Sequence, residues 1–171
     1  TTGSINFDQS QINFSENKKN DIIRAKKIGI IYQQNNLLPD FTALENIYLA
    51  SLSLHNDKDL AVLKAKRLLK LVGLSNRSDH YPSQLSGGES QRIAIARAII
   101  NDPEVILADE PTGNLDEETA KEITKLIFSM NKEIGTTLIM VTHNHELAEM
   151  TDRILYLKSG ELVEDKLLRV S

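Results

Sequence analysis

The fold is decided by a stretch that opens with Val105-Ile-Leu-Ala-Asp-Glu-Pro111 and closes with Thr136-Thr-Leu-Ile-Met-Val141. Both ends contain nearly continuous apolar runs, a pattern typical of strands buried on both faces of a parallel sheet. The residues between them, from about Asp116 to Glu133, are spaced like a helix, and Gly135 is suited to end it. Strand, helix and strand make a βαβ unit, so the sequence predicts an α/β fold.

Further strands are predicted on either side of this unit. Ile28–Tyr32 and Arg153–Leu157 are short runs rich in β-formers, and Gly3–Phe7 alternates like a short antiparallel or edge strand.

The segment between about 40 and 100 carries helix signals instead. Thr42-Ala-Leu-Glu45 and Ser86-Gly-Gly-Glu89 are capping boxes, which mark the starts of helices. A third helix is expected over Asp57–Val72, where apolar residues recur at helical spacing before Gly73. We therefore expect a helical block inserted into the sheet domain.

The composition limits the classes of function. The chain has 171 residues and a net charge of −4, so it lacks the strongly basic balance of a general nucleic-acid binder. It contains no cysteine, which excludes disulfides, thiol catalysis and cysteine-based zinc sites. No run reaches the roughly 18 apolar residues of a membrane span.

The strongest functional motif is the heptad Leu85-Ser-Gly-Gly-Glu-Ser-Gln91. Its glycines allow the backbone to approach an anion closely, and the helix that follows offers free N–H groups and a positive dipole at its N-terminus. Taken alone, the heptad also fits an ordinary serine cap with glycine in the first turn of a helix.

Two adjacent carboxylates, Asp109 and Glu110, follow the apolar run that begins at Val105. Ligands of open α/β folds bind at the carboxyl ends of the strands, and adjacent residues of an extended chain point to opposite sides. Asp109 can then offer an oxygen ligand to Mg²⁺, while Glu110 orients or deprotonates a water molecule. The alternative is a strand that ends in two solvated acids.

Two other polar residues follow predicted strands. His143 comes after Thr136–Val141 and Gln33 after Ile28–Tyr32, which places both at the expected ligand edge. A single histidine or glutamine is more often structural than functional. The remaining histidines have no such context and are expected at the surface: His55, His80 and His145.

Together these motifs resemble those of the ATP-binding cassette (ABC) ATPases, in that family's order and over essentially the whole chain. The heptad resembles the signature motif, and Val105–Glu110 resembles the Walker B strand with its catalytic glutamate. Gln33 matches the Q-loop, Asn114-Leu-Asp116 the D-loop and His143 the switch histidine.

The resemblance implies a P-loop NTPase-like (RecA-like) α/β core with a mostly parallel sheet and an inserted α-helical subdomain. Residues 1–39 would be core with the Q-loop. Residues 40–100 would be the helical subdomain, ending in the signature motif and its helix. Residues 101–171 would be core with the Walker B strand, D-loop and H-loop.

The resemblance also implies an ATP hydrolase that uses Mg²⁺. Glu110 and His143 would be catalytic, and Asp109 and Gln33 would ligate the metal. The residues implied to bind the nucleotide are Gln33, Ser86, Gly87, Gly88, Gln91 and Asp116.

The same resemblance implies two kinds of partner. A second ATPase subunit would pack head to tail, so that the signature motif of one subunit faces the γ-phosphate held by the other. Membrane subunits would dock near Gln33–Asn46, with the chain peripheral on the cytoplasmic face of the inner membrane. No nucleic-acid partner is expected.

Within the family, Leu107–Asp116 is similar to a subgroup that contains lipoprotein-releasing, macrolide-exporter-type and cell-division ATPases. Ile28–Asn46 most resembles the lipoprotein-releasing members. The expected function is therefore to power lipoprotein release from the bacterial inner membrane. The alternatives are a macrolide-exporter-type or cell-division complex, or a non-catalytic fragment.

DNA-repair and chromosome-organising ATPases share the signature heptad and form another alternative. They carry long coiled coils or zinc modules between the Q-loop and the signature. Here that interval is short, helical and free of cysteine, which argues against them.

One family motif is missing from the sequence. None of the eight glycines is followed by lysine, so the chain contains no phosphate-binding G-x-x-x-x-G-K-[ST] loop. We interpret the chain as an ATPase core that is incomplete at its N-terminus, with a natural partial copy as the alternative. The chain alone is expected to bind nucleotide weakly and not to hydrolyse it.

Overall fold

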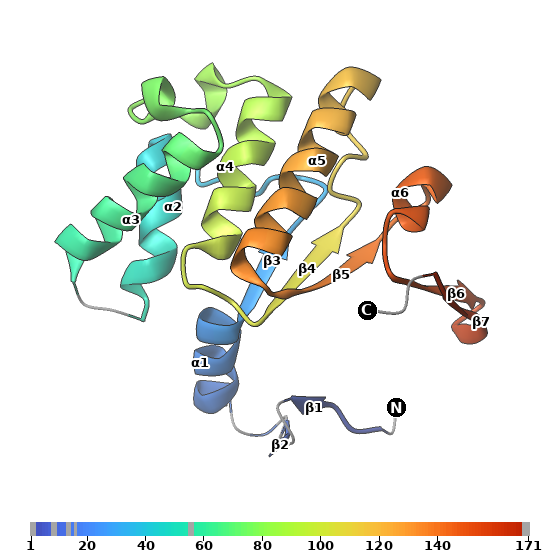
Figure 1. Cartoon of the computed structure of the whole chain (residues 1–171). Coiled ribbons are helices and arrows are strands. Elements are labelled where there is room, and N and C mark those ends of the chain that lie inside the picture. The colour runs from blue at the N-terminus through green and yellow to red at the C-terminus, as the bar shows by residue number, and fades with distance from the viewer. Residues whose placement is uncertain (1–2, 8–9, 13–14, 16, 55–56, 169–171) are drawn as a thin grey trace.

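A three-stranded parallel sheet forms the centre of the molecule, in the order β3 (Ile28–Ile31), β4 (Val105–Asp109) and β5 (Thr137–Val141). The structure is a computed structural model that describes residues 3–7, 10–12, 15, 17–54 and 57–168. Ile28 pairs with Val105 and Val105 with Thr137, so the strands end at a common edge (Figure 1). The parallel α/β fold predicted from the sequence is confirmed.

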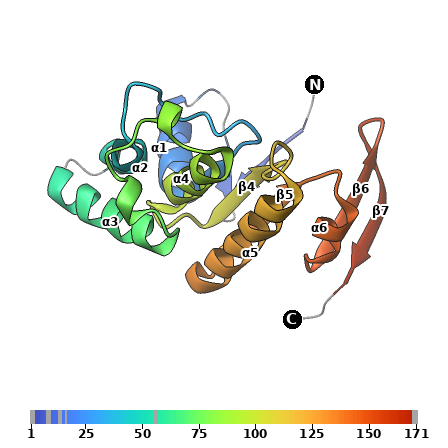
Figure 2. The ribbon, with the colours of Figure 1, turned by 90° about the horizontal axis from the view of Figure 1, so that it is seen from above.

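Helices α4 (Gly87–Ile99) and α5 (Glu117–Ile134) cover one face of this sheet (Figures 1 and 2). Asp116 caps the start of α5, and Gly135 ends it in the left-handed conformation that glycine tolerates best. The βαβ unit expected between Val105 and Val141 is therefore present.

The packing of α4 against β3 is unusually close at one residue. A Cβ atom built on Gly29 would lie 2.3 Å from the main-chain oxygen of Ala98 and 3.2 Å from Cγ of Pro103. Only glycine leaves room for this approach, which fixes α4 on the sheet.

Helices α2 (Ala43–Leu52) and α3 (Lys58–Leu71) pack beside α4 and complete the apolar core. Ile47, Leu69 and Ile93 are at most 1% exposed. Short 3₁₀ turns at Ser75–Arg77 and Pro82–Gln84 link α3 to α4. The helix starts expected after Thr42, Asp57 and Ser86 all occur, each with a side-chain cap.

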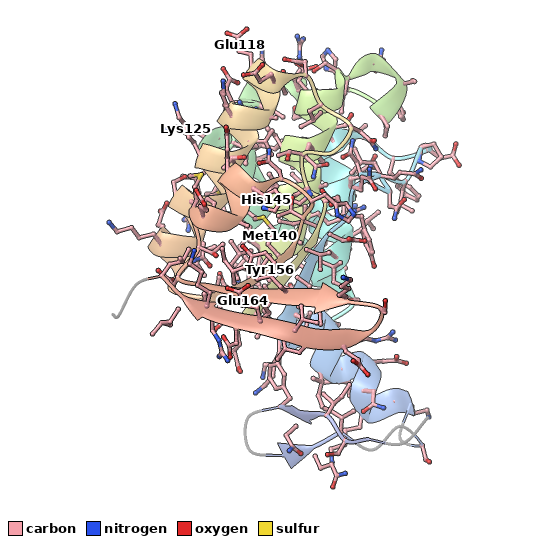
Figure 3. The ribbon with its side chains drawn as sticks, turned by 90° about the vertical axis from the view of Figure 1, so that its right-hand side faces the viewer. Glu118, Lys125, Met140, His145, Tyr156 and Glu164 are labelled. Atoms are coloured by element: carbon pink, nitrogen blue, oxygen red, sulfur yellow. The ribbon has the colours of Figure 1, made fainter. Side chains whose placement is uncertain are left out.

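The strand expected at Arg153–Leu157 does not join the parallel sheet. It forms β6 (Arg153–Lys158) and pairs antiparallel with β7 (Glu161–Leu167), a strand that the sequence analysis did not predict. Figure 3 looks at this hairpin, with Tyr156 and Glu164 on it and Met140 of β5 behind it. Charged residues in β7 and the exposure of its whole length explain why it carries no apolar strand signal.

The open side of β5 has no neighbouring strand among the described residues. Ile139 and Val141 on β5 are 53% and 59% exposed. Unpaired strand edges with apolar side chains favour association with other strands.

The remaining elements are two short strands and two helices. β1 (Asn6–Phe7) and β2 (Ser10–Gln11) pair antiparallel, as the alternation in Gly3–Phe7 indicated. Helices α1 (Asn17–Lys27) and α6 (His145–Glu149) were not predicted. α1 is highly polar and α6 has only five residues, so neither contains a long apolar stripe.

Candidate functional site

The loops that follow the three parallel strands bring the predicted site residues to one edge of the sheet. Gln33 follows β3, Asp109 ends β4, and His143 follows β5. The register pairs Ile31 with Ala108 and Asp109 with Val141, so the loops leave the sheet at the same level. This is the edge at which open α/β folds bind ligands.

Glu110 is held by the loop that follows β5. Its backbone N–H donates to the carbonyl of Val141 at 2.9 Å. Its carboxylate accepts the backbone N–H of His143 at 2.7 Å and the hydroxyl of Thr142 at 3.3 Å. Glu110 has a φ of 43°, a left-handed conformation that non-glycine residues adopt at some cost, often at functional sites. The sequence analysis did not select Thr142, and a threonine beside a histidine gives no specific signal.

The ring of His143 lies beside the same carboxylate, with Nε2 3.7 Å from a carboxylate oxygen of Glu110. The histidine side chain is 98% exposed, whereas that of Glu110 is 19% exposed. The pair therefore places a partly protected carboxylate next to a freely accessible imidazole.

Asp109 is the last residue of β4 and is exposed. With the side-chain oxygen of Gln33 it offers hard oxygen donors, which suit Mg²⁺. Within the described ranges, no three His, Cys, Asp or Glu residues are grouped so that they could hold a metal ion. Mg²⁺ in proteins often has one or two carboxylate ligands together with substrate phosphate oxygens and water.

Gln33 also connects the loops after β3 and β4. Its Nε2 donates to Oδ1 of Asn114 at 3.3 Å, and Nδ2 of Asn114 donates to the carbonyl of Gln33 at 3.2 Å. A Cβ atom on Gly113 would lie 3.0 Å from Nε2 of Gln33, so glycine leaves room for this amide. Asn114 belongs to the Asn114–Asp116 motif, but nothing in the sequence indicates its contact with Gln33.

Ser86 caps α4, and both halves of its capping box are present. Its hydroxyl accepts the N–H of Glu89 at 3.1 Å, and the Glu89 carboxylate accepts the N–H of Ser86 at 2.8 Å. This backbone hydrogen bond, with help from Arg77 at 2.8 Å, lowers the pKa of Glu89 below its usual value. The charged carboxylate thus stabilises the turn that presents Gly87 and Gly88.

The two glycines of this turn differ in their surroundings. A Cβ atom on Gly88 would lie 2.6 Å from Cγ2 of Thr119 in α5, whereas one on Gly87 would meet only Leu115, at 3.5 Å. Gly87 is exposed and Gly88 is half-buried. Gly88 therefore has a packing role between α4 and α5, independent of any ligand.

Asp116 also has a structural role, as the cap of α5. Its side chain accepts the backbone N–H of Thr119 at 3.0 Å, and hydrogen bonds from Thr119 lower the pKa of Asp116. The side chain is exposed, and the preceding residue, Leu115, lies next to Gly87, so Asp116 can meet a further partner near the start of α4.

The expectation that Gln91 touches a nucleotide does not agree with its position. Gln91 is 1% exposed, and its amide donates to the carbonyl of Pro111 at 2.8 Å and to that of Tyr32 at 3.4 Å. Its side chain holds the bases of two site loops against α4. The sequence gives no indication of this burial, because Gln91 is a polar residue within a polar motif.

The structure describes two of the other histidines, His80 and His145. His145 is exposed on α6, beside α5 and its Lys125 (Figure 3). His80 is half-buried, and its Nε2 lies 3.3 Å from a guanidinium nitrogen of Arg77. His55 lies outside the described residues.

The site thus combines two carboxylates at the end of a strand, a histidine after the next strand, and a serine-capped helix that begins with two glycines. A sequence profile described as ABC transporter matches residues 1–113. The chain belongs to the ABC transporter family. Among the described residues no helix is long and apolar enough to cross a membrane.

Curated relatives in this family are similar over most of the chain. The lipoprotein-releasing system ATP-binding protein LolD of Bordetella avium is 43% identical over 163 residues, which is 95% of this chain and 71% of the relative. The protein of the same name from Rickettsia bellii is 48% identical over 148 residues, 86% of this chain and 67% of the relative.

Solved ABC cassettes share the fold. A dimeric post-hydrolysis structure of the ATP-binding cassette MJ0796 bound to ADP and phosphate has a TM-score of 0.88 and 39% identity. It covers all of this chain, and the chain covers 75% of it. A second dimeric structure of MJ0796 gives the same values.

Proposed function

We propose that this ABC protein belongs to the ATP-hydrolysing subunit of a transporter that releases lipoproteins from the bacterial inner membrane. The observation that supports ATP hydrolysis is the contact between Glu110 and His143 at the ligand edge of the sheet. The Glu110 carboxylate accepts the backbone N–H of His143 and lies beside its imidazole. The cargo class rests on the similarity to the lipoprotein-releasing relatives.

The residues at this edge have separate roles in ATP hydrolysis. Mg²⁺ would be held by Asp109 and Gln33, and when bound it offsets the charge of the phosphates. Glu110 orients the attacking water and accepts its proton. The backbone N–H of His143 and the hydroxyl of Thr142 keep the Glu110 carboxylate in place, because each donates to one of its oxygens.

The signature turn completes the site of a second subunit. Ser86, Gly87 and Gly88 present the N-terminus of α4, whose free N–H groups and dipole favour an anion. Gly87 and Asp116 are exposed at adjoining helix starts, which suits a contact between two copies packed head to tail.

The membrane subunits would dock on the loop from Tyr32 to Thr42, with the chain peripheral at the cytoplasmic face. Leu38 and Phe41 are 45% and 39% exposed on this loop. A hollow of about 340 Å³ lies alongside, lined by residues of α1, β3, α2 and α4 and by Tyr32 and Asn36 of the loop itself. Exposed apolar side chains beside a hollow are typical of a protein interface.

The docking assignment is tested by association with detergent-solubilised membrane subunits of a lipoprotein-releasing transporter. Phe41→Ala should weaken association at least about tenfold, the loss typical of a buried interface anchor. Leu71→Ala on α3 is a matched control, because Leu71 is also an exposed apolar side chain, 51% exposed. Equal losses for both variants would contradict a specific docking loop.

A further inference from the structure

The loop between β3 and α2 has no regular secondary structure from Tyr32 to Thr42, yet two side chains from helices fix its backbone. One is Asn46 in the first turns of α2, and the other is Arg97 in α4. Neither side chain belongs to the exposed surface of the loop.

Asn46 makes four hydrogen bonds to the loop. Its Nδ2 donates to the carbonyls of Leu38 at 3.1 Å, Phe41 at 2.9 Å and Thr42 at 3.0 Å. Its Oδ1 accepts the N–H of Leu38 at 2.7 Å. Asn46 is 1% exposed, so the loop backbone groups replace water as hydrogen-bond partners of its side-chain amide. Loss of one of these hydrogen bonds leaves a buried polar group unpaired.

Arg97 holds the preceding part of the loop. Its guanidinium donates to the carbonyl of Asn36 at 2.6 Å and to that of Asn35 at 2.7 Å. The two hydrogen bonds use the planar fork of the guanidinium, which the single ammonium of lysine does not reproduce. Burial lowers the pKa of Arg97 from its usual value, as expected for a charge drawn away from solvent.

Asn36 adopts a φ of 48°, a left-handed conformation in which asparagine is less strained than most residues. The Arg97 contact falls on the carbonyl of this same residue. Arg97 therefore stabilises the point at which the loop turns.

We infer that Asn46 and Arg97 are positioning residues that hold the 32–42 loop in its docking conformation, so that they set the affinity for the membrane subunits without touching them. This inference rests on the docking surface proposed above. A loop that is already ordered loses little conformational freedom on binding, which strengthens association. The exposed Leu38 and Phe41 are then presented in a fixed arrangement.

The first measurement is hydrogen exchange of the loop amides in the chain itself, which requires no partner. Arg97→Lys keeps the charge but loses the paired hydrogen bonds, and exchange in the loop should rise at least about tenfold. Asn46→Asp keeps one oxygen acceptor and loses the three donated hydrogen bonds, and it should have the same effect. Lys64→Ala is the control, since its exposed ion pair with Asp102 lies outside the loop.

The second measurement is affinity for the detergent-solubilised membrane subunits. Arg97→Lys should bind at least about tenfold more weakly, while its melting temperature and helical circular dichroism stay close to those of the unchanged chain. Should Asn46→Asp fail to fold, Arg97→Lys still decides the question.

The outcomes separate the two proposals. Faster loop exchange together with weaker binding supports the inference. Unchanged loop exchange in Arg97→Lys overturns it, whatever the binding shows. Faster loop exchange with unchanged affinity also overturns it, provided that Phe41→Ala weakens binding. If Phe41→Ala binds normally as well, the proposed docking surface is contradicted. The inference that Asn46 and Arg97 set the affinity for the membrane subunits is then contradicted too.

Discussion

Replacement of Gly29 by alanine should be among the most destabilising single changes in this protein. The added Cβ would lie 2.3 Å from the main-chain oxygen of Ala98, against an ordinary contact distance of at least 3.4 Å. The atom that it meets is backbone in the last turn of α4, so no side-chain rotation relieves the contact. β3 and α4 must separate by about 1 Å, in a region where packing tolerates little change.

The expected loss follows from this displacement. Overpacking of a core costs about 1–3 kcal/mol, and a contact with backbone belongs at the upper end, so we expect at least about 3 kcal/mol. For a urea dependence of about 2 kcal/mol per molar, the unfolding midpoint falls by about 1.5 M. Urea unfolding followed by far-ultraviolet circular dichroism measures this shift.

Gly87→Ala is the matched control, because its added Cβ would meet only Leu115, at 3.5 Å. It should change the free energy of unfolding by no more than about 0.5 kcal/mol. A loss below about 1 kcal/mol for Gly29→Ala, with an unchanged urea slope, would refute the idea that close packing at this glycine fixes α4 on the sheet.

Other changes test the site itself. Glu110→Gln, in the chain joined to a segment that supplies a phosphate-binding loop, should keep ATP binding but lower turnover at least about 10²-fold in a phosphate-release assay; near-normal turnover would assign the base to another residue. Gly88→Ala should lower the melting temperature more than Gly87→Ala, because its Cβ would lie 2.6 Å from Thr119. The pKa of Glu89 is lower in the folded protein than its usual value of 4.5. The ionised carboxylate therefore stabilises the fold fully above pH 4.5, and this stabilisation is lost as the pH falls through the folded-state pKa. The stability advantage over Glu89→Gln in urea unfolding should therefore disappear in acid, and an advantage that persisted there would contradict the assignment.

The sequence predicted those elements whose signals are local. Thr42, Ser86 and Asp116 mark helix starts through capping groups within three residues, and the structure contains all three caps. The strands before Asp109 and His143 were predictable because both are apolar runs between turn residues.

What the sequence could not supply depends on contacts between distant segments. Gln91 is part of the signature heptad in the sequence. Its hydrogen bonds to the carbonyls of Pro111 and Tyr32, however, depend on how α4 packs against the sheet. The pairing of β6 with β7 likewise depends on backbone hydrogen bonds rather than on apolar spacing. The contacts of Arg97 with the 32–42 loop join residues 61 and 62 positions apart, and no local pattern encodes them.

The parallel pairing of β3 with β4 has a consequence for how the protein is made. Ile28 pairs with Val105, which a ribosome adding about 5–20 residues each second delivers roughly 4–15 s later. Throughout that interval β3 is without its partner, while the contacts of α2 and α3 with each other can already form. The helical block should thus be the first part of the nascent chain to resist proteolysis, and slow translation between Ala43 and Ile99 would prolong the time in which β3 is open to chaperones and to misassembly.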